Sequence, residues 1–356
     1  MEKKITFIHG ADFHLGRSFP YDSLEKREEG RKDRFQTFQN MVEDCQRRQV
    51  DFLFLVGDIF EQELFQRKDG YRILDALRSL RKTMVFFLLG NHDYKLENFL
   101  EENAPENVYI FPSGEFHTIE IPEYNVSIMG ESWGRETFQK KLSILSTDVR
   151  EKGRNILLHH GMWGGDSYFP LDIPLDLHKK FSYIGFGHIH KPMEILENAY
   201  MVGTPEILDY GDKGHRGWIY GEIDESLRVE FIPASGKRIE EKQWKIWKES
   251  GFQEIQEGMK SLGFSKEGIY ELTWTGEYPE RGILEGIQEH WTQSGYTIRF
   301  LENLGWKRDY EGIYRQYKDT LLGRYLEEIS RLSIEDKMKQ EMIDVGIEAF
   351  LKGERR

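Results

Sequence analysis

The sequence predicts an α/β fold in which buried strands alternate with amphipathic helices. Five short apolar runs have the length and composition of buried strands, and each leads directly into polar side chains of types that bind metals. Helical spacing of apolar residues separates the first three runs. Because continuously apolar strands need cover on both faces, this alternation is typical of an α/β domain. The five runs are residues 5–8, 52–56, 85–89, 156–158 and 183–186.

The first and largest domain is expected to cover residues 1–235. Helices are expected over 31–49 and 66–82, between the first three strands. Near its end the pattern changes to two short strands that predict a closing antiparallel hairpin. Pro233-Ala234-Ser235-Gly236, which is followed by charged residues, marks the boundary. The two hairpin strands are 217–220 and 227–231.

Residues 236–305 are expected to form a small second α/β domain. Apolar and polar residues alternate over 270–274 and 296–300, which predicts two strands, and a helix-like stretch at 281–292 lies between them. The segment also holds Trp244, Trp247, Trp274 and Trp291. Tryptophans of this kind either pack in a core or stack on nucleic-acid bases, and core packing is the commoner use.

Residues 306–356 are expected to be helical. Apolar residues recur every three or four positions over 314–332 and again over 334–349, which predicts two helices. The first stripe is rich in tyrosine and the second contains methionines, and both residue types are common on partner surfaces. A hairpin packed on the body of the same protein explains the pattern equally well.

Composition limits the class of protein and its partners. The net charge of −13 disfavours nucleic acid, which usually meets basic surface. That argument is weaker for a two-metal enzyme, because two divalent ions bring four positive charges and the carboxylates of Asp12 and Asp58 remove only two. The single cysteine excludes an intramolecular disulfide. The chain has neither a signal-like segment nor an apolar run long enough for a membrane, so we expect a cytoplasmic protein.

The polar residues that follow the five strands are ligand types of a two-metal hydrolase. Each motif alone has an ordinary structural explanation, such as a glycine turn or an asparagine cap. Together they follow one another at strand ends, where ligands gather in α/β sheets, and this coincidence favours a metal site. The motifs are Asp12-Phe13-His14, Gly57-Asp58, Gly90-Asn91-His92-Asp93, His159-His160-Gly161 and Gly187-His188-Ile189-His190.

The two histidine pairs differ in what they predict. His188 and His190 are two residues apart and face the same side of an extended segment, as two ligands of one site require. His159 and His160 are adjacent and therefore face opposite ways on a strand. We expect His159 to be the ligand and His160 to contact either a ligand or the substrate.

With these motifs in place, the chain resembles the calcineurin-like metallophosphoesterase superfamily, and within it the SbcD-type and YhaO-type DNA-repair exonuclease branch. The resemblance covers roughly residues 1–235. It implies a β-sandwich flanked by helices, followed by a small α/β cap domain and C-terminal helices. Gly203-Thr204-Pro205 is similar to the Gly-Ser-Pro turn that follows the last motif in that branch.

The resemblance also implies a site with two divalent metal ions, typically Mn²⁺. Hard oxygen and borderline imidazole ligands without a thiolate suit manganese. One ion would be held by Asp12, His14 and His190, the other by Asn91, His159 and His188, and Asp58 would bridge them.

The resemblance assigns the chemistry to His92, which would protonate the leaving oxygen without ligating a metal. Asp93 would either fix the tautomer of His92 or cap a following helix. Some relatives carry a histidine three residues after the bridging aspartate, where this chain has Glu61. A carboxylate there would repel a phosphate, which puts direct substrate contact by Glu61 in doubt.

The resemblance thus implies a manganese-dependent DNA exonuclease and endonuclease that acts with an SbcC-type coiled-coil ATPase bound through residues 306–356, and it leaves a homodimer open. Two other functions remain open. A phosphodiesterase or phosphatase for nucleotides or other small phosphoesters would suit the acidic surface, and a metal-free scaffold could use the same fold. The full set of ligand types argues against the scaffold.

Overall fold

The computed structural model describes residues 3–134, 142–143, 149–151, 153–164, 170–174, 176–280, 282–305, 310–332, 334 and 336–353. The chain divides into two compact units. The larger unit comprises Met1–Lys242, Leu262–Leu272 and Glu289–Arg299, and the smaller comprises Gln243–Ser261, Thr273–Gln288 and Phe300–Arg356.

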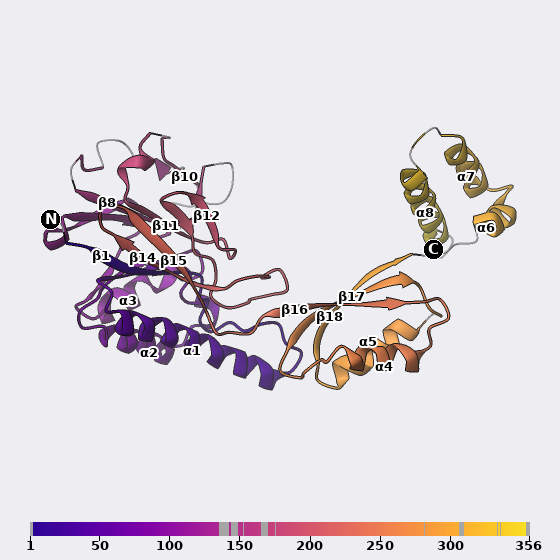
Figure 1. Ribbon diagram of the computed structural model, residues 1–356, viewed down its shortest axis with the longest axis horizontal. Helices are drawn as coiled ribbons and strands as arrows, with labels where there is room; N and C mark the ends of the chain where they lie inside the picture. The colour runs from indigo at the N-terminus through magenta and orange to yellow at the C-terminus, as the bar shows by residue number, and fades with distance from the viewer. Residues whose placement is uncertain are drawn as a thin grey trace. The chain divides into compact units, whose positions relative to one another are not determined.

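Two six-stranded sheets form the centre of the larger unit (Figure 1). The first has the order β15-β14-β1-β2-β3-β4 and the second β12-β13-β11-β8-β6-β5. One apolar cluster joins buried residues of both sheets, including Phe7 and Phe54 of the first and Ile156 and Tyr183 of the second. The sheets therefore pack as a sandwich, as expected for the α/β class.

The central strands of each sheet are parallel, so their carboxyl ends lie at one edge. In the first sheet β1, β2, β3 and β4 are parallel, with the antiparallel hairpin of β14 and β15 beside β1. In the second sheet β6, β8, β11 and β13 are parallel, and β5 and β12 are antiparallel edges. The bounds in the first sheet are β1 Ile5–Gly10, β2 Phe52–Val56, β3 Met84–Leu88, β4 Val108–Ile110, β14 Gly217–Ile223 and β15 Leu227–Pro233. In the second they are β5 His117–Ile121, β6 Val126–Glu131, β8 Arg154–His160, β11 Tyr183–Gly187, β12 Met193–Leu196 and β13 Ala199–Met201.

Three helices cover the outer face of the first sheet (Figure 1): α1 (Leu24–Arg48), α2 (Arg67–Arg78) and α3 (Glu97–Asn103). Helix α1 begins seven residues before the predicted 31–49. The prediction missed its first turns because they are mostly charged and exposed and carry no apolar stripe. Ser23 caps it by accepting a hydrogen bond from the backbone N–H of Lys26.

The outer face of the second sheet packs on shorter elements. A further apolar cluster joins Leu157 of β8 and Phe186 of β11 to Leu171 and Phe181. A small sheet of order β7-β10-β9 belongs to the same region. Its strands are β7 Leu142–Ser143, β9 Met162–Trp163 and β10 Pro170–Asp172.

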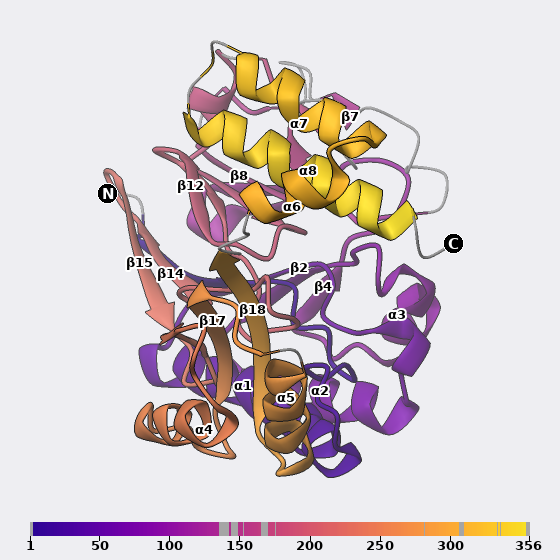
Figure 2. The same ribbon diagram turned by 90° about the vertical axis from the view of Figure 1, so that its right-hand side faces the viewer.

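A three-stranded sheet of order β16-β17-β18 lies within residues 236–305, with two helices (Figure 2). Trp274 and Trp291 are buried, which fits core packing, whereas Trp247 is 51% exposed. Core packing therefore accounts for Trp274 and Trp291, and the ring of Trp247 lies 4.1 Å from the ammonium group of Lys245. The elements are β16 Ile239–Ile246, α4 Phe252–Ser261, β17 Ile269–Glu277, α5 Ile283–Gln293 and β18 Thr297–Gly305.

The C-terminal segment holds three helices instead of the two expected: α6 (Tyr310–Tyr317), α7 (Leu321–Arg331) and α8 (Asp336–Gly353). The first predicted stripe is interrupted at Thr320, whose backbone is extended and whose hydroxyl accepts a hydrogen bond from the N–H of Gly323. A local cap thus starts a new helix although the apolar spacing continues. The three helices share an apolar cluster of their own.

None of the helices within the described residues is both long enough and apolar enough to cross a membrane.

His9 gives the sandwich a pH-dependent stability. Its ring is fully buried, and Nδ1 lies 2.8 Å from the hydroxyl of Tyr183. Burial lowers the pKa of His9 from 6.5 to about 3. Between pH 6.5 and about pH 3, His9 is protonated in the unfolded chain and neutral in the folded one. The contribution of neutral His9 to the free energy of unfolding is therefore complete above pH 6.5 and is lost as the pH falls. At about pH 5 the loss due to His9 should be about 2 kcal/mol. Urea unfolding of a His9→Gln variant at about pH 7.5 and about pH 5 should show a smaller loss than in the parent, and equal losses would contradict this origin.

Candidate metal centre

Loops from both sheets meet at the carboxyl edge of the sandwich with an unusual backbone. Among the described non-glycine residues, six have a positive φ, and four of these carry side chains of the predicted site: Asp12, His14, Asp58 and His188. Such a backbone is costly for residues with a Cβ atom and is concentrated at functional sites. The surrounding structure therefore holds these four side chains in directions that a relaxed turn would not give.

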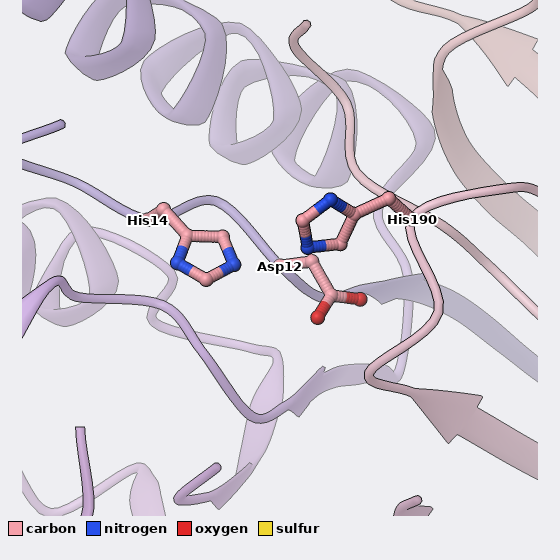
Figure 3. Close-up of side chains that lie close together, drawn as sticks. All are labelled: Asp12, His14 and His190. Carbon is pink, nitrogen blue, oxygen red and sulfur yellow. The ribbon is translucent and has the colours of Figure 1, made fainter. Parts of the chain in front are cut away.

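The first cluster contains Asp12, His14 and His190, each offering one ligand atom within 4.8 Å of the others. Figure 3 shows the side chain of Asp12 close to the imidazoles of His14 and His190. The Asp12 carboxylate is buried and accepts the backbone N–H of His188 at 3.0 Å, which connects the loops after β1 and β11. Nε2 of His14 is buried without a hydrogen-bond partner, as expected for a nitrogen that keeps its lone pair for a cation.

The second cluster contains Asp58, His160 and His188, again within 4.8 Å. Asn91 joins it through Oδ1, which lies 3.2 Å from Nε2 of His160 and 3.1 Å from Nδ1 of His188. Asp58 lies next to both clusters, because Oδ2 is 3.3 Å from His160 Nε2 and 3.8 Å from His14 Nε2. The Asp58 carboxylate is therefore close to a histidine of each cluster.

The structure brings His160, and not His159, into this cluster. His159 is fully buried, and its ring packs on Phe116 and Phe186 on the other face of the second sheet. The prediction for the pair favoured His159, whereas the structure places His160 beside Asp58 and His188. His160 is in phase with Ile156 and Leu158, which face the first sheet, but both faces of β8 are apolar, so the sequence could not show which face meets the site.

The second cluster has the chemistry of a cation site. Nδ1 of His160 donates to the carbonyl of Val56 at 2.9 Å, which leaves Nε2 to face the oxygens of Asp58 and Asn91. An imidazole fixed through one nitrogen by a backbone carbonyl is the usual state of a metal-ligating histidine. Lone pairs that converge in a buried space need a proton or a metal ion between them. The residues present therefore fit a metal.

The pKa shifts of three of these residues also indicate a site that favours a positive charge. Burial lowers the pKa of His160, but the facing Asp58 carboxylate outweighs it and raises the pKa to about 9. Burial raises the pKa of Asp58, but His160 and then His14 outweigh it, so the carboxyl stays ionised. Burial, reinforced by His160, lowers the pKa of His188 to about 4, which leaves a neutral imidazole suited to coordination.

Glu61 occupies a position that sequence reasoning did not anticipate. It is buried between two histidines, with Oε1 2.9 Å from Nδ1 of His92 and Oε2 3.4 Å from Nδ1 of His14. The hydrogen bond to Glu61 raises the pKa of His92, although burial opposes it. Glu61 thus orients both imidazoles, the role considered for Asp93. The acidic sequence around position 61 gave no signal of these contacts.

Asp93 is fully buried and joins two motifs through the backbone. Its carboxylate accepts N–H groups of Gly90, Ile59 and Phe60 at 2.6, 2.7 and 3.2 Å. The neighbouring His92 donates its backbone N–H to Asp58 at 2.8 Å. Asp93 therefore shapes the loops after β2 and β3 and does not hold the ring of His92.

His190 is positioned by residues from further along the chain. Its Nδ1 lies 3.6 Å from the carboxylate of Asp212, and its carbonyl accepts the N–H of Thr204 at 3.0 Å. Gly203 has a φ of +73°, and a Cβ there would lie 2.6 Å from the His190 carbonyl oxygen. This contact explains why a glycine begins the Gly203-Thr204-Pro205 turn.

A family model for calcineurin-like phosphoesterases matches residues 5–192, more than half of the chain and all five motifs. The chain belongs to the calcineurin-like phosphoesterase family. The family predicted from the motifs is thereby confirmed, and the two sheets flanked by helices are consistent with its fold.

Two relatives extend the comparison. The chain is 26% identical over 242 residues to the uncharacterized metallophosphoesterase YhaO of Bacillus subtilis, which covers 59% of this chain and 56% of YhaO. It is 28% identical over 199 residues to the DNA double-strand break repair protein Mre11 of Methanocaldococcus jannaschii, which covers 52% of each chain. The chain thus matches only about half the length of these relatives. A solved dimetal phosphatase from Danio rerio has 12% identity and a TM-score of 0.39, over 64% of this chain and 96% of that one.

The close approach of Gly57 to His160 provides a test of the second cluster. A Cβ at Gly57 would lie 2.1 Å from His160 Nδ1, so Gly57→Ala must displace the ring. Gly114 also has a positive φ but open space around its Cβ position, so Gly114→Ala is a matched control for backbone strain. Titration calorimetry with Mn²⁺ should show at least about tenfold weaker binding for Gly57→Ala alone. Equal affinities in the two variants would contradict a site at His160.

Proposed function

We propose that this chain is a manganese-dependent DNA nuclease that hydrolyses phosphodiester bonds at a two-metal centre. Its family implies hydrolysis of phosphoesters. The observation that carries the proposal is the pair of adjacent, mostly buried clusters, with Asp58 in one and 3.8 Å from His14 of the other. Two adjacent groups of carboxylate, amide and imidazole ligand atoms are the arrangement that a pair of divalent ions requires.

The proposed ligands follow the two clusters. Asp12, His14 and His190 would hold one ion, Asn91, His160 and His188 the other, and Asp58 would bridge them. His160 replaces His159 in this set because His160 lies beside Asp58 and His188, whereas His159 packs on Phe186. Imidazole and oxygen ligands without a thiolate are the set that suits Mn²⁺.

When bound, two such ions would lower the pKa of a water molecule and neutralise charge on the phosphate. The residues of the chain do the remaining work. His92 would donate a proton from Nε2 to the leaving oxygen, because Nδ1 is engaged by Glu61. Its side chain is 38% exposed and can therefore reach a substrate, whereas the buried Asp93 only holds the loops in place.

DNA is proposed as the substrate because of the relatives. Several of them are named DNA double-strand break repair proteins, at 23% to 28% identity over at least half of this chain. The competing function is hydrolysis of nucleotides or other small phosphoesters, which the net charge of −13 favours. An SbcC-type coiled-coil ATPase is the proposed partner of residues 306–356, and a homodimer is a further proposal.

Removal of the proposed acid should separate binding from turnover. His92→Ala should retain Mn²⁺ affinity and lose about 10²- to 10⁴-fold in the rate of phosphodiester hydrolysis, since only proton transfer is removed. His117→Ala, a change of an exposed histidine outside the clusters, is the control. Hydrolysis by His92→Ala at the parent's rate would disprove the assignment.

The substrate class can be measured by competition. With Mn²⁺ present, end-labelled linear duplex DNA should be cleaved, and an excess of a mononucleotide ester should inhibit this cleavage only weakly. The physical reason is that a polymer contacts the protein at several phosphates and a mononucleotide at one. Efficient hydrolysis of the mononucleotide ester with intact DNA would favour the small-phosphoester function.

Deletion of residues 306–356 tests the proposed partner. Leu321 and Val345 of this segment are 77% and 67% exposed and are therefore accessible to another protein. The truncated chain should hydrolyse a small phosphodiester at the parent's rate and fail to associate with an SbcC-type ATPase in sedimentation. Association that survives the deletion would exclude this segment as the docking site.

A further inference from the structure

A cationic cavity adjoins the loop that carries Asp12 and His14. It has a volume of about 480 Å³ and lies wholly within the larger unit, between α1, the start of α2 and Gly16 of that loop. A volume of this size is in the range of small-ligand sites. Gly16, which lines the cavity, is two residues beyond His14 in the same loop.

The charge of this cavity is opposite to that of the whole chain. Its wall contains four cationic side chains against two acidic ones, whereas the protein carries a net charge of −13. Cations gathered in a concave surface attract anions more strongly than the same charges spread over a convex one. The cationic members are Arg31 and Lys32 of α1 and Lys68 and Arg72 of α2.

Two of these cations are held in place before any ligand arrives. The guanidinium of Arg72 lies 4.8 Å from the ring centroid of Phe35, which is itself buried. Nε of Arg31 donates to the carbonyl of Gly16 at 3.0 Å, and its Nη1 pairs with Glu28. Pre-ordered guanidinium groups lose little entropy on binding and match the geometry of a phosphate.

The bond from Arg31 to Gly16 also connects the cavity to the site. Leu15, which precedes Gly16, accepts a hydrogen bond from the backbone N–H of Glu61 at 3.0 Å. The loops of the metal clusters therefore form one wall of the cavity. An extended chain with an ester at the metals could place a neighbouring phosphate there.

We propose that this cavity binds a backbone phosphate of DNA close to the bond being cleaved. The inference rests on the proposed nuclease function and names a part of its substrate path. It accounts for how an acidic protein could hold a polyanion: the cations are concentrated beside the site, and the rest of the surface remains negative. A small phosphoester, which has no second phosphate, gains nothing from the cavity.

The test compares two doubly substituted variants of the full chain. Lys32→Ala/Lys68→Ala removes two cations from the cavity. Lys179→Ala/Lys180→Ala removes two exposed lysines that line a separate cavity, so the change in net charge is the same. Each protein is assayed with Mn²⁺ for hydrolysis of bis(4-nitrophenyl) phosphate and for binding of a short DNA duplex over a range of salt concentrations.

The cavity variant should hydrolyse the small ester at the parent's rate and bind DNA about tenfold more weakly, with a salt dependence reduced by about one phosphate contact. The control variant should match the parent in both assays. If the cavity variant binds DNA as tightly as the control variant, the inference is overturned and the nuclease proposal remains intact. A parent that hydrolyses the ester but neither binds nor cleaves DNA would overturn both, and the two failures are therefore distinguishable.

Discussion

The candidate site depends on how closely three loops approach one another at the edge of the sandwich. Gly57 and Gly90 leave no room for a Cβ, because the atoms of His160 and Asp58 lie where it would be. Asp93 joins two of these loops, those after β2 and β3, by accepting three backbone N–H groups within the interior. This contact permits side chains from β1, β2, β3, β8 and β11 to share one buried volume. Without it the same residues would be separate surface loops.

That close approach has an electrostatic consequence. Carboxylate and amide oxygens and imidazole nitrogens packed away from water converge with few protons to share, as where Nε2 of His160 faces Asp58 and Asn91. A cation relieves the mismatch, so the geometry that excludes a Cβ is also the geometry that favours a metal. Glu61 adds a carboxylate that contacts both His14 and His92.

The sequence predicted the architecture well because burial leaves a direct record in it. Runs such as 52–56 are apolar on both faces because helices cover one side and the second sheet the other. It was less successful where local capping outweighs periodicity. Ser23 starts α1 before any apolar stripe, and Thr320 divides a continuous stripe into α6 and α7.

By itself the sequence determined the family and the strand ends whose polar residues meet at the candidate site, since these depend on residue identity and order. The tertiary structure decided which neighbours meet. It selected His160 over His159, because only the side of β8 that faces the first sheet reaches Val56 and Asp58. It also gave Glu61 and Asp212 their positions beside the histidines, and it gathered four cations from two helices into one cavity in an acidic protein. Contacts between residues distant in sequence depend on how sheets and helices pack, and local patterns do not encode that packing.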